Sequence, residues 1–179
     1  MIAIILNGTS SAGKTSIARS MLSQSGEPMF HVAPDMYNEM VDWSSVPEEL
    51  EEECDDIIMA NFIRSLPVLA SNRFPIIIDI VLDGYELADC VEALKDRRII
   101  LVGVHCSLEI AEARERERGD REIGLAKEQF DPVHRGKAYD LELNTSSMTP
   151  SHCAEIILKY IKELTANNLP QSTETSSAD

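Results

Sequence analysis

The sequence predicts an α/β fold in which helices cover both faces of a parallel five-stranded sheet. Short apolar runs alternate with longer stretches of helical pattern, and this order is typical of successive βαβ units. Runs such as Ile76-Ile77-Ile78 are apolar throughout, which suits strands buried on both faces of a sheet. A glycine-rich segment at 8–15 separates the first apolar run from the first helical stretch.

The expected elements follow one another from the N-terminus. Strands are expected at residues 2–6, 29–33, 75–80, 99–104 and 140–144. Helices are expected at residues 14–24, 47–70, 84–94, 108–118, 122–130 and 151–165.

Local signals support three of these helices. The helix at 47–70 starts in a run of acidic side chains, which the positive end of a helix dipole favours. The helix at 108–118 breaks at Gly119. Pro150 and Ser151 open the last helix, with Ser151 as the expected cap and Glu155 in the first turns.

Length and charge predict one domain and limit its partners. We expect residues 1–165 to form that domain and the polar residues 166–179 to form a disordered tail. The net charge of −15 argues against nucleic acid and anionic membranes as partners. The sequence shows neither a membrane-spanning apolar run nor a signal peptide, and its four cysteines are scattered without metal-binding spacing. These features favour a cytoplasmic protein with a small-molecule substrate, and they leave the oligomeric state open.

The segment GTSSAGKT at 8–15 is a complete phosphate-binding loop, G-x-x-x-x-G-K-[ST], between a strand and a helix. Glycines allow successive backbone N–H groups to point at one anion, and the helix dipole adds positive charge. The side chain of Lys14 suits the β- and γ-phosphates of ATP, and the hydroxyl of Thr15 suits Mg²⁺. The expected nucleotide-binding residues of the loop are Gly8, Thr9, Ser10, Ser11, Ala12, Gly13, Lys14 and Thr15.

Two aspartates follow predicted strands, where ligands of parallel sheets bind. Asp35, after the second strand, could orient a substrate hydroxyl or accept its proton, although an N-cap for a helix at 36–40 is the alternative. Asp79 ends the third strand as a Walker B residue does, and is the candidate Mg²⁺ ligand beside Thr15. The apolar stretch at 36–43 is a candidate pocket wall for an uncharged aromatic acceptor.

An arginine-rich segment at 114–121 ends the fourth predicted helix. Like charges at Arg114 and Arg118 are unfavourable for the helix alone, so we interpret the segment as a phosphate-facing lid with a hinge at Gly119. Arg118 and Arg121 flank that glycine and are the preferred catalytic arginines, and Arg114 is a candidate for nucleotide binding.

In this order, these segments resemble the chloramphenicol phosphotransferase family of small P-loop kinases. The resemblance covers residues 2–162 and is most specific at Val102-Gly103-Val104 and at Arg118-Gly119-Asp120-Arg121. It implies a three-layer, nucleoside-kinase-like P-loop fold. It also implies transfer of the ATP γ-phosphoryl group to the primary hydroxyl of chloramphenicol, which would inactivate the antibiotic.

The resemblance also implies roles for individual residues. Asp35 matches the family's base, and Arg118 and Arg121 match its lid arginines. The loop at Asn144 and Thr145 is expected beside the adenine. Ile80 departs from the family, which often has a second acid there.

Two alternatives stay open at this point. One is a P-loop kinase for another small alcohol, such as a sugar acid, a shikimate-like compound or a nucleotide. The other is a nucleotide-binding regulatory ATPase with no small acceptor.

Overall fold

The computed structural model describes residues 1–82, 84–119 and 123–166 of the 179-residue chain. Its five-stranded sheet has the order β2-β3-β1-β4-β5, and every pair of neighbours is parallel. The strands are β1 (Ile2–Asn7), β2 (Phe30–Val32), β3 (Ile76–Ile80), β4 (Arg98–His105) and β5 (Leu141–Asn144). The helices are α1 (Lys14–Gln24), α2 (Asp35–Asn38), α3 (Glu51–Leu69), α4 (Gly84–Ala93), α5 (Leu108–Arg118), α6 (Leu125–Phe130) and α7 (Pro150–Ala166). The predicted α/β fold is confirmed.

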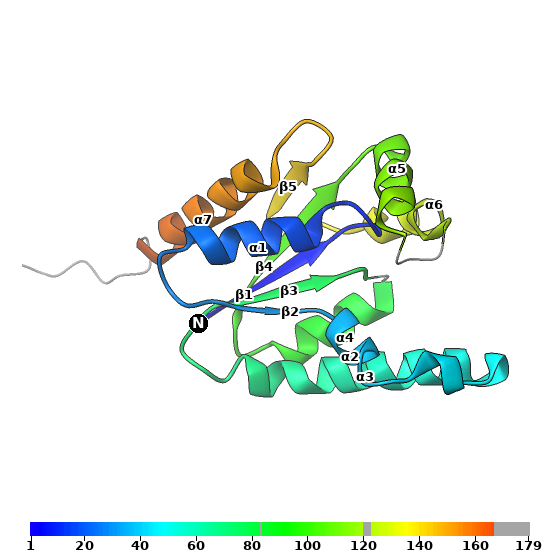
Figure 1. Cartoon of the computed structure of the whole chain (residues 1–179). Coiled ribbons are helices and arrows are strands. Elements are labelled where there is room, and N and C mark those ends of the chain that lie inside the picture. The colour runs from blue at the N-terminus through cyan, green and yellow to red at the C-terminus, as the bar shows by residue number, and fades with distance from the viewer. Residues whose placement is uncertain (83, 120–122, 167–179) are drawn as a thin grey trace, which may run out of the picture.

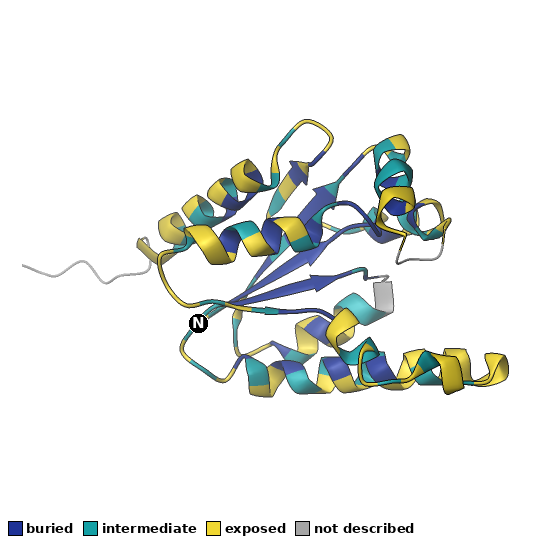
Figure 2. Ribbon diagram, viewed as in Figure 1, coloured by how far each residue is buried: buried dark blue, intermediate teal, exposed yellow. Residues whose placement is uncertain are grey.

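Helices α1 and α7 cover one face of the sheet, and α3 and α4 cover the other (Figure 1). Successive side chains of one strand point to opposite faces of the sheet, so neighbouring residues pack in different hydrophobic layers. In β3, Ile77 packs in the layer of α1, whereas Ile76 and Ile78 pack with Phe62 of α3. The central strands are therefore buried on both sides (Figure 2), which explains their uninterrupted apolar sequence.

The carboxyl ends of the strands lie together at one edge of the sheet. The segment from 8 to 13 follows β1, α2 follows β2, and the turn that leads to α7 follows β5. Strand β1 lies between β3 and β4, so the loop after it opens where the chain passes to opposite sides of the sheet. This is the position at which open α/β sheets bind ligands.

Several helix boundaries differ from the prediction. The helix expected at 47–70 begins at Glu51, after a 3₁₀ turn at Glu48–Leu50. The expected Ser151 cap is wrong: Thr149 accepts the His152 N–H through its hydroxyl at 3.2 Å, and Ser151 lies inside α7. Proline is favoured at the first position of a helix, so Pro150 moves the cap to the residue before it.

Parts of the predicted organisation lie outside the described residues. These are 167–179 of the expected tail, and Glu122 at the start of the helix expected at 122–130. That helix begins later than predicted, at Leu125, after a turn at 123–124. In the part of the chain that the structure describes, no helix combines the length and apolar character needed to cross a membrane.

Candidate functional site

The loop after β1 has the backbone of a phosphate cradle. Gly13 has φ +97°, a left-handed conformation that strongly favours glycine, and α1 begins at the next residue. Gly8 is required for a different reason, because a Cβ atom there would collide with the backbone carbonyl of Val104. The positive end of α1 therefore opens onto the loop.

Side chains and backbone of this loop are held from two directions. Lys14 Nζ donates to the carbonyls of Gly8 at 2.8 Å and Thr9 at 3.0 Å. The Ser10 N–H donates to Gln129 Oε1 at 2.8 Å, and the Thr9 hydroxyl donates to a carbonyl of α6 at 2.8 Å. Helix α6 is thus docked on the loop.

Two hydroxyls of the loop lack a protein partner. Ser10 and Ser11 are 5% and 9% exposed, and their Oγ atoms make no hydrogen bond within the described residues. Both residues line a cavity. Because burying an unpaired hydroxyl is costly, these groups fit a cavity that receives a polar ligand.

Thr15 and Asp79 meet as the Walker pattern predicts. The Thr15 hydroxyl donates to Asp79 Oδ2 at 2.6 Å, and His31 Nε2 of β2 lies 3.6 Å from the same oxygen. Burial alone would raise the pKa of Asp79. Contact with His31, the charge of Lys14 and the Thr15 hydroxyl outweigh it and hold that pKa below its ordinary value. Asp79 is therefore an anion beside a hydroxyl, a donor pair that suits a hard cation.

Arg114 joins the phosphate loop to the turn after β5. Its guanidinium donates to the Thr145 hydroxyl at 3.1 Å and to the Thr145 carbonyl at 3.0 Å. The Thr145 hydroxyl in turn donates to the carbonyl of Ala12 at 2.7 Å. Both Arg114 and Thr145 border the cavity, so this clamp also fixes part of its wall.

Glu115 is a buried residue of α5 that contacts the start of α6. It is 1% exposed and accepts the N–H groups of Gly124 at 2.9 Å and Ala126 at 2.8 Å. The carboxylate thereby satisfies the start of α6, where a negative charge is favourable. Helices α5 and α6 are held together by this contact.

One cavity of about 840 Å³ collects most of the predicted site. Asp35, the first residue of α2, borders it together with Arg118 at the end of α5. Asp35 follows Pro34 at the N-cap position, so the alternative of Asp35 as a cap is wrong. The predicted residues that line the cavity are Ser10, Ser11, Gly13, Lys14, Thr15, Asp35, Asp79, Arg114, Arg118 and Thr145.

Other predicted residues lie elsewhere. Gly8, Thr9 and Ala12 are buried parts of the loop and are not among the residues lining the cavity. Asn144 is exposed, and its Oδ1 accepts the Ser146 N–H at 2.9 Å. Arg121 lies outside the described residues.

The prediction of an apolar wall at 36–43 is wrong. Tyr37 turns toward α3, where its ring packs edge-on against Phe62 and its hydroxyl donates to Ser65 at 2.6 Å. Met36 and Met40 are exposed. The apolar lining comes instead from Ile58, Met59, Ile80 and Val81.

Sequence reasoning missed several residues at the cavity. Gln129 and Glu86 line it, and His31 touches Asp79 from β2. Asp55 and Asp56 also line it, although the sequence pointed only to an acidic run. Asp55 precedes Ile58 by three residues and Phe62 by seven, so it extends their buried stripe to an exposed position that borders the cavity.

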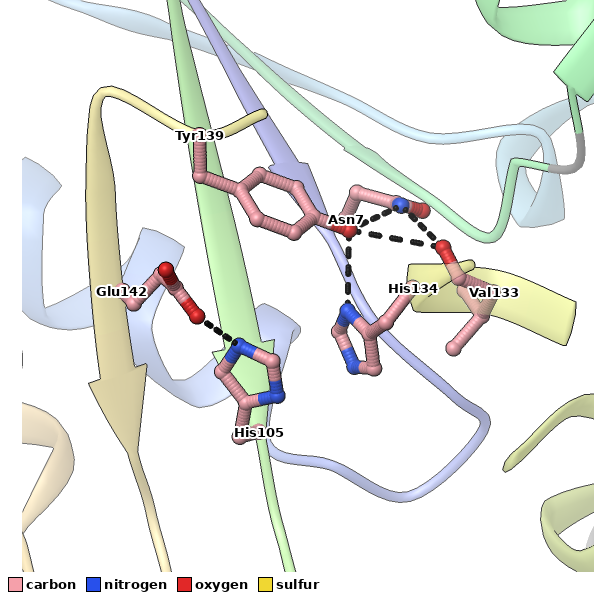
Figure 3. Close-up of polar contacts among 6 residues, drawn as sticks. All are labelled: Asn7, His105, Val133, His134, Tyr139 and Glu142. Carbon is pink, nitrogen blue, oxygen red and sulfur yellow. Dashed lines mark hydrogen bonds and ion pairs between the residues drawn. The ribbon is translucent and has the colours of Figure 1, made fainter. Parts of the chain in front are cut away.

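A polar network supports the loop from the side of β4 and β5 (Figure 3). Asn7 Nδ2 donates to the carbonyl of Val133 and to the Tyr139 hydroxyl, both at 2.9 Å, and Asn7 Oδ1 accepts the Leu82 N–H at 2.9 Å. The Tyr139 ring lies where a side chain of Gly103 would be.

Two histidines complete this network. The rings of His105 and His134 stack with centroids 4.0 Å apart, and His134 Nδ1 lies 2.8 Å from the Tyr139 hydroxyl. His105 Nε2 lies 3.0 Å from Glu142 Oε2. None of these residues borders the cavity, so the network positions the loop rather than contacting a ligand.

Comparisons with known proteins show the family to which this chain is similar. A family model described as chloramphenicol phosphotransferase-like protein matches residues 2–162. A Mycobacterium tuberculosis protein with the provisional name O-phosphotransferase is 32% identical over 178 residues, covering 83% of this chain and 76% of that protein.

Solved structures share the fold. A gluconokinase from Sinorhizobium meliloti superposes with a TM-score of 0.65 at 15% identity, over 93% of this chain and 97% of its own. A shikimate kinase from Acinetobacter baumannii superposes with a TM-score of 0.64 at 18% identity, over 93% and 94% of the two chains. The chain therefore shares the fold of these two kinases.

Proposed function

The chain belongs to the chloramphenicol phosphotransferase-like family and is a phosphotransferase that acts on a hydroxyl group; from that premise we propose that it transfers the γ-phosphoryl group of ATP to a small alcohol. The observation that carries the proposal is a single cavity that joins the phosphate loop to Asp35. One end of it suits a nucleotide, and the other has room for an acceptor.

The residues of the cavity can perform the transfer by positioning and charge. Loop N–H groups, the hydroxyls of Ser10 and Ser11, and Lys14 would hold the phosphates. Arg118 would neutralise charge on the moving phosphoryl group. Asp35 would orient the acceptor hydroxyl and receive its proton. A loose transition state needs little help from a base, so orientation is the larger part of that role.

Thr15 and Asp79 would hold Mg²⁺. Among the described residues, no group of three or more histidine, cysteine or acidic side chains could form a metal cage. That agrees with Mg²⁺, which kinases hold with one or two protein groups, water and substrate phosphates. When bound, the ion would neutralise charge on the β- and γ-phosphates.

Chloramphenicol is the first acceptor to consider, because the family carries its name. Phosphorylation of its primary hydroxyl would inactivate the antibiotic. We place the enzyme in the cytoplasm, where Mg·ATP is abundant. A regulatory ATPase without an acceptor is the weaker candidate, because the cavity extends well past the phosphate loop to α2, α3 and α4.

The test is turnover of Mg·ATP by the purified protein with chloramphenicol, followed by mass spectrometry of the drug. A gain of one phosphoryl group establishes both the kinase reaction and this acceptor. If a panel of other small alcohols is phosphorylated instead, the kinase proposal stands and chloramphenicol is excluded. ATP hydrolysis that no alcohol stimulates would favour the regulatory ATPase.

A further inference from the structure

The acceptor end of the cavity is lined by carboxylates. Asp35, Asp55, Asp56 and Glu86 come from α2, α3 and α4, below the sheet in Figure 1, together with the apolar side chains of Ile58 and Met59. Among the described residues that line the cavity, these three helices contribute no lysine, arginine or histidine. The cationic lining residues Lys14, Arg114 and Arg118 lie on α1 and α5 instead.

Helix stability does not account for the two aspartates of α3. The dipole favours acids in the first turn, and Glu51, Glu52 and Glu53 already occupy it. The effect falls off beyond that turn, where Asp55 and Asp56 lie. Asp55 also continues the stripe of Ile58 and Phe62 that faces the sheet, so the helix directs a carboxylate toward the cavity where its apolar face ends.

A second observation shows that this cavity is built for a polar ligand. The hydroxyls of Ser10 and Ser11 are buried at the opposite wall and have no hydrogen-bond partner within the described residues. The negative charge of a nucleotide that pairs with them would be offset by Lys14, Arg114 and Arg118 and by Mg²⁺. The carboxylates at the other end of the cavity then set the charge that an acceptor meets, which favours a cation and repels an anion.

We propose that the acceptor is a protonated amino alcohol, with its ammonium group against Asp55 and Asp56 and its hydroxyl at Asp35. This inference rests on the proposed phosphotransferase activity and specifies its substrate class. The hydroxyl oxygen forms a bond to the γ-phosphorus of ATP, the bond from that phosphorus to the β,γ-bridging oxygen breaks, and ADP leaves. Asp35 takes the hydroxyl proton. The ammonium has no lone pair, so transfer occurs on oxygen only.

The test compares three acceptors that share one primary alcohol. They are chloramphenicol, which is neutral; its deacylated amine, which is a cation when protonated; and the N-oxalyl derivative of that amine, which is an anion. We expect kcat/KM to be highest for the amine, with an advantage over chloramphenicol of about tenfold, or about 1.4 kcal/mol. The advantage should shrink as salt is added, because the carboxylates are partly solvated.

The matched variants change two charges on the same helix. Asp55→Asn with Asp56→Asn should reduce the amine-to-neutral ratio of kcat/KM about tenfold. Glu52→Gln with Glu53→Gln alters the net charge equally but lies outside the cavity lining, and should leave the ratio as it is. A ratio that responds equally to both pairs would assign the preference to overall charge and overturn the proposal.

Binding of the same three compounds to the protein with Mg²⁺ and a non-hydrolysable ATP analogue separates two failures. If the amine binds preferentially but nothing is phosphorylated, the phosphotransferase proposal fails while the charge preference stands. If chloramphenicol or the anion binds as well as the amine, or the amine does not bind, the inference is overturned whatever the turnover.

Discussion

Replacement of Asn7 tests whether one buried amide holds together the segments around the phosphate loop. Asn7 is fully buried, and Asn7→Ala removes three hydrogen bonds of 2.9 Å. Those to Val133 and Tyr139 are drawn in Figure 3, and the third is to Leu82. Leu82 is also fully buried, so its N–H loses its partner without gaining water. That orphaned donor costs about 1–3 kcal/mol and each of the other bonds about 0.5–1.5 kcal/mol.

The sum is a loss of about 4 kcal/mol, from which we expect the melting temperature to fall by about 8–16 °C in a chain of this size. Thermal and urea unfolding followed by circular dichroism would measure it. Asn61→Ala is the matched control, because Asn61 is exposed on α3 and its replacement should change stability by less than about 0.5 kcal/mol.

Equal melting temperatures for Asn7→Ala and Asn61→Ala would refute the reasoning. A second comparison concerns the Tyr139 hydroxyl, which contacts both Asn7 Nδ2 and His134 Nδ1. Tyr139→Phe keeps the ring that packs over Gly103 and removes only that hydroxyl. We expect Tyr139→Phe to cost about 1 kcal/mol alone and less than that in the Asn7→Ala background, because the shared bond is then already lost.

Three further predictions concern the site and its surroundings. Asp35→Asn should lower kcat by about 10²-fold or more in the kinase assay while calorimetry finds ATP affinity intact, and full turnover would remove Asp35 from the reaction. Arg118→Ala should likewise lower kcat by about 10²-fold, and a rate equal to that of the wild type would exclude the lid role. Burial, with the charges of His105 and Lys137, lowers the pKa of His134 from 6.5 to about 4. Between pH 6.5 and about pH 4 the unfolded chain therefore binds more protons than the folded protein, so stability falls as the pH is lowered through this range. Urea titrations would measure the difference in free energy of unfolding between wild type and His134→Gln. We expect this difference to fall by about 1 kcal/mol from pH 7 to pH 5, after allowance for solvent screening. A difference that does not change with pH would contradict the lowered pKa of His134.

The two strand-end aspartates of the site could be predicted because each signal is local. The phosphate loop is contiguous in sequence, and the strand before Asp79 is apolar without interruption. Since carboxyl ends of parallel strands share one edge, position after a strand was enough to place Asp35 and Asp79 together. The structure brings both into one cavity with Lys14.

Other features escaped prediction because they depend on partners far along the chain. Gln129 meets the Ser10 N–H across 119 residues, and Arg114 reaches Thr145 across 31. No pattern in the sequence specifies such pairs, since the residues around a glutamine or an arginine do not reveal its distant partner. The prediction of an apolar wall at 36–43 was wrong for a related reason, because the Tyr37 ring packs against Phe62 of α3 instead of lining the cavity.

The sequence by itself determined the α/β class, the phosphate loop and the family, because these follow from periodicity and from residues adjacent in the chain. Only the tertiary structure decided what surrounds the acceptor. From the sequence, a solvated helix start explained most of the acidic run, and a selectivity role against acidic substrates was the weaker interpretation. The packing of α3 against the sheet divides this acidic run. Glu51, Glu52 and Glu53 lie outside the cavity lining, whereas Asp55 and Asp56 are part of it. Helix rotation against the sheet is set by burial of Ile58, Phe62 and Leu66, and that packing gives the cavity its charge.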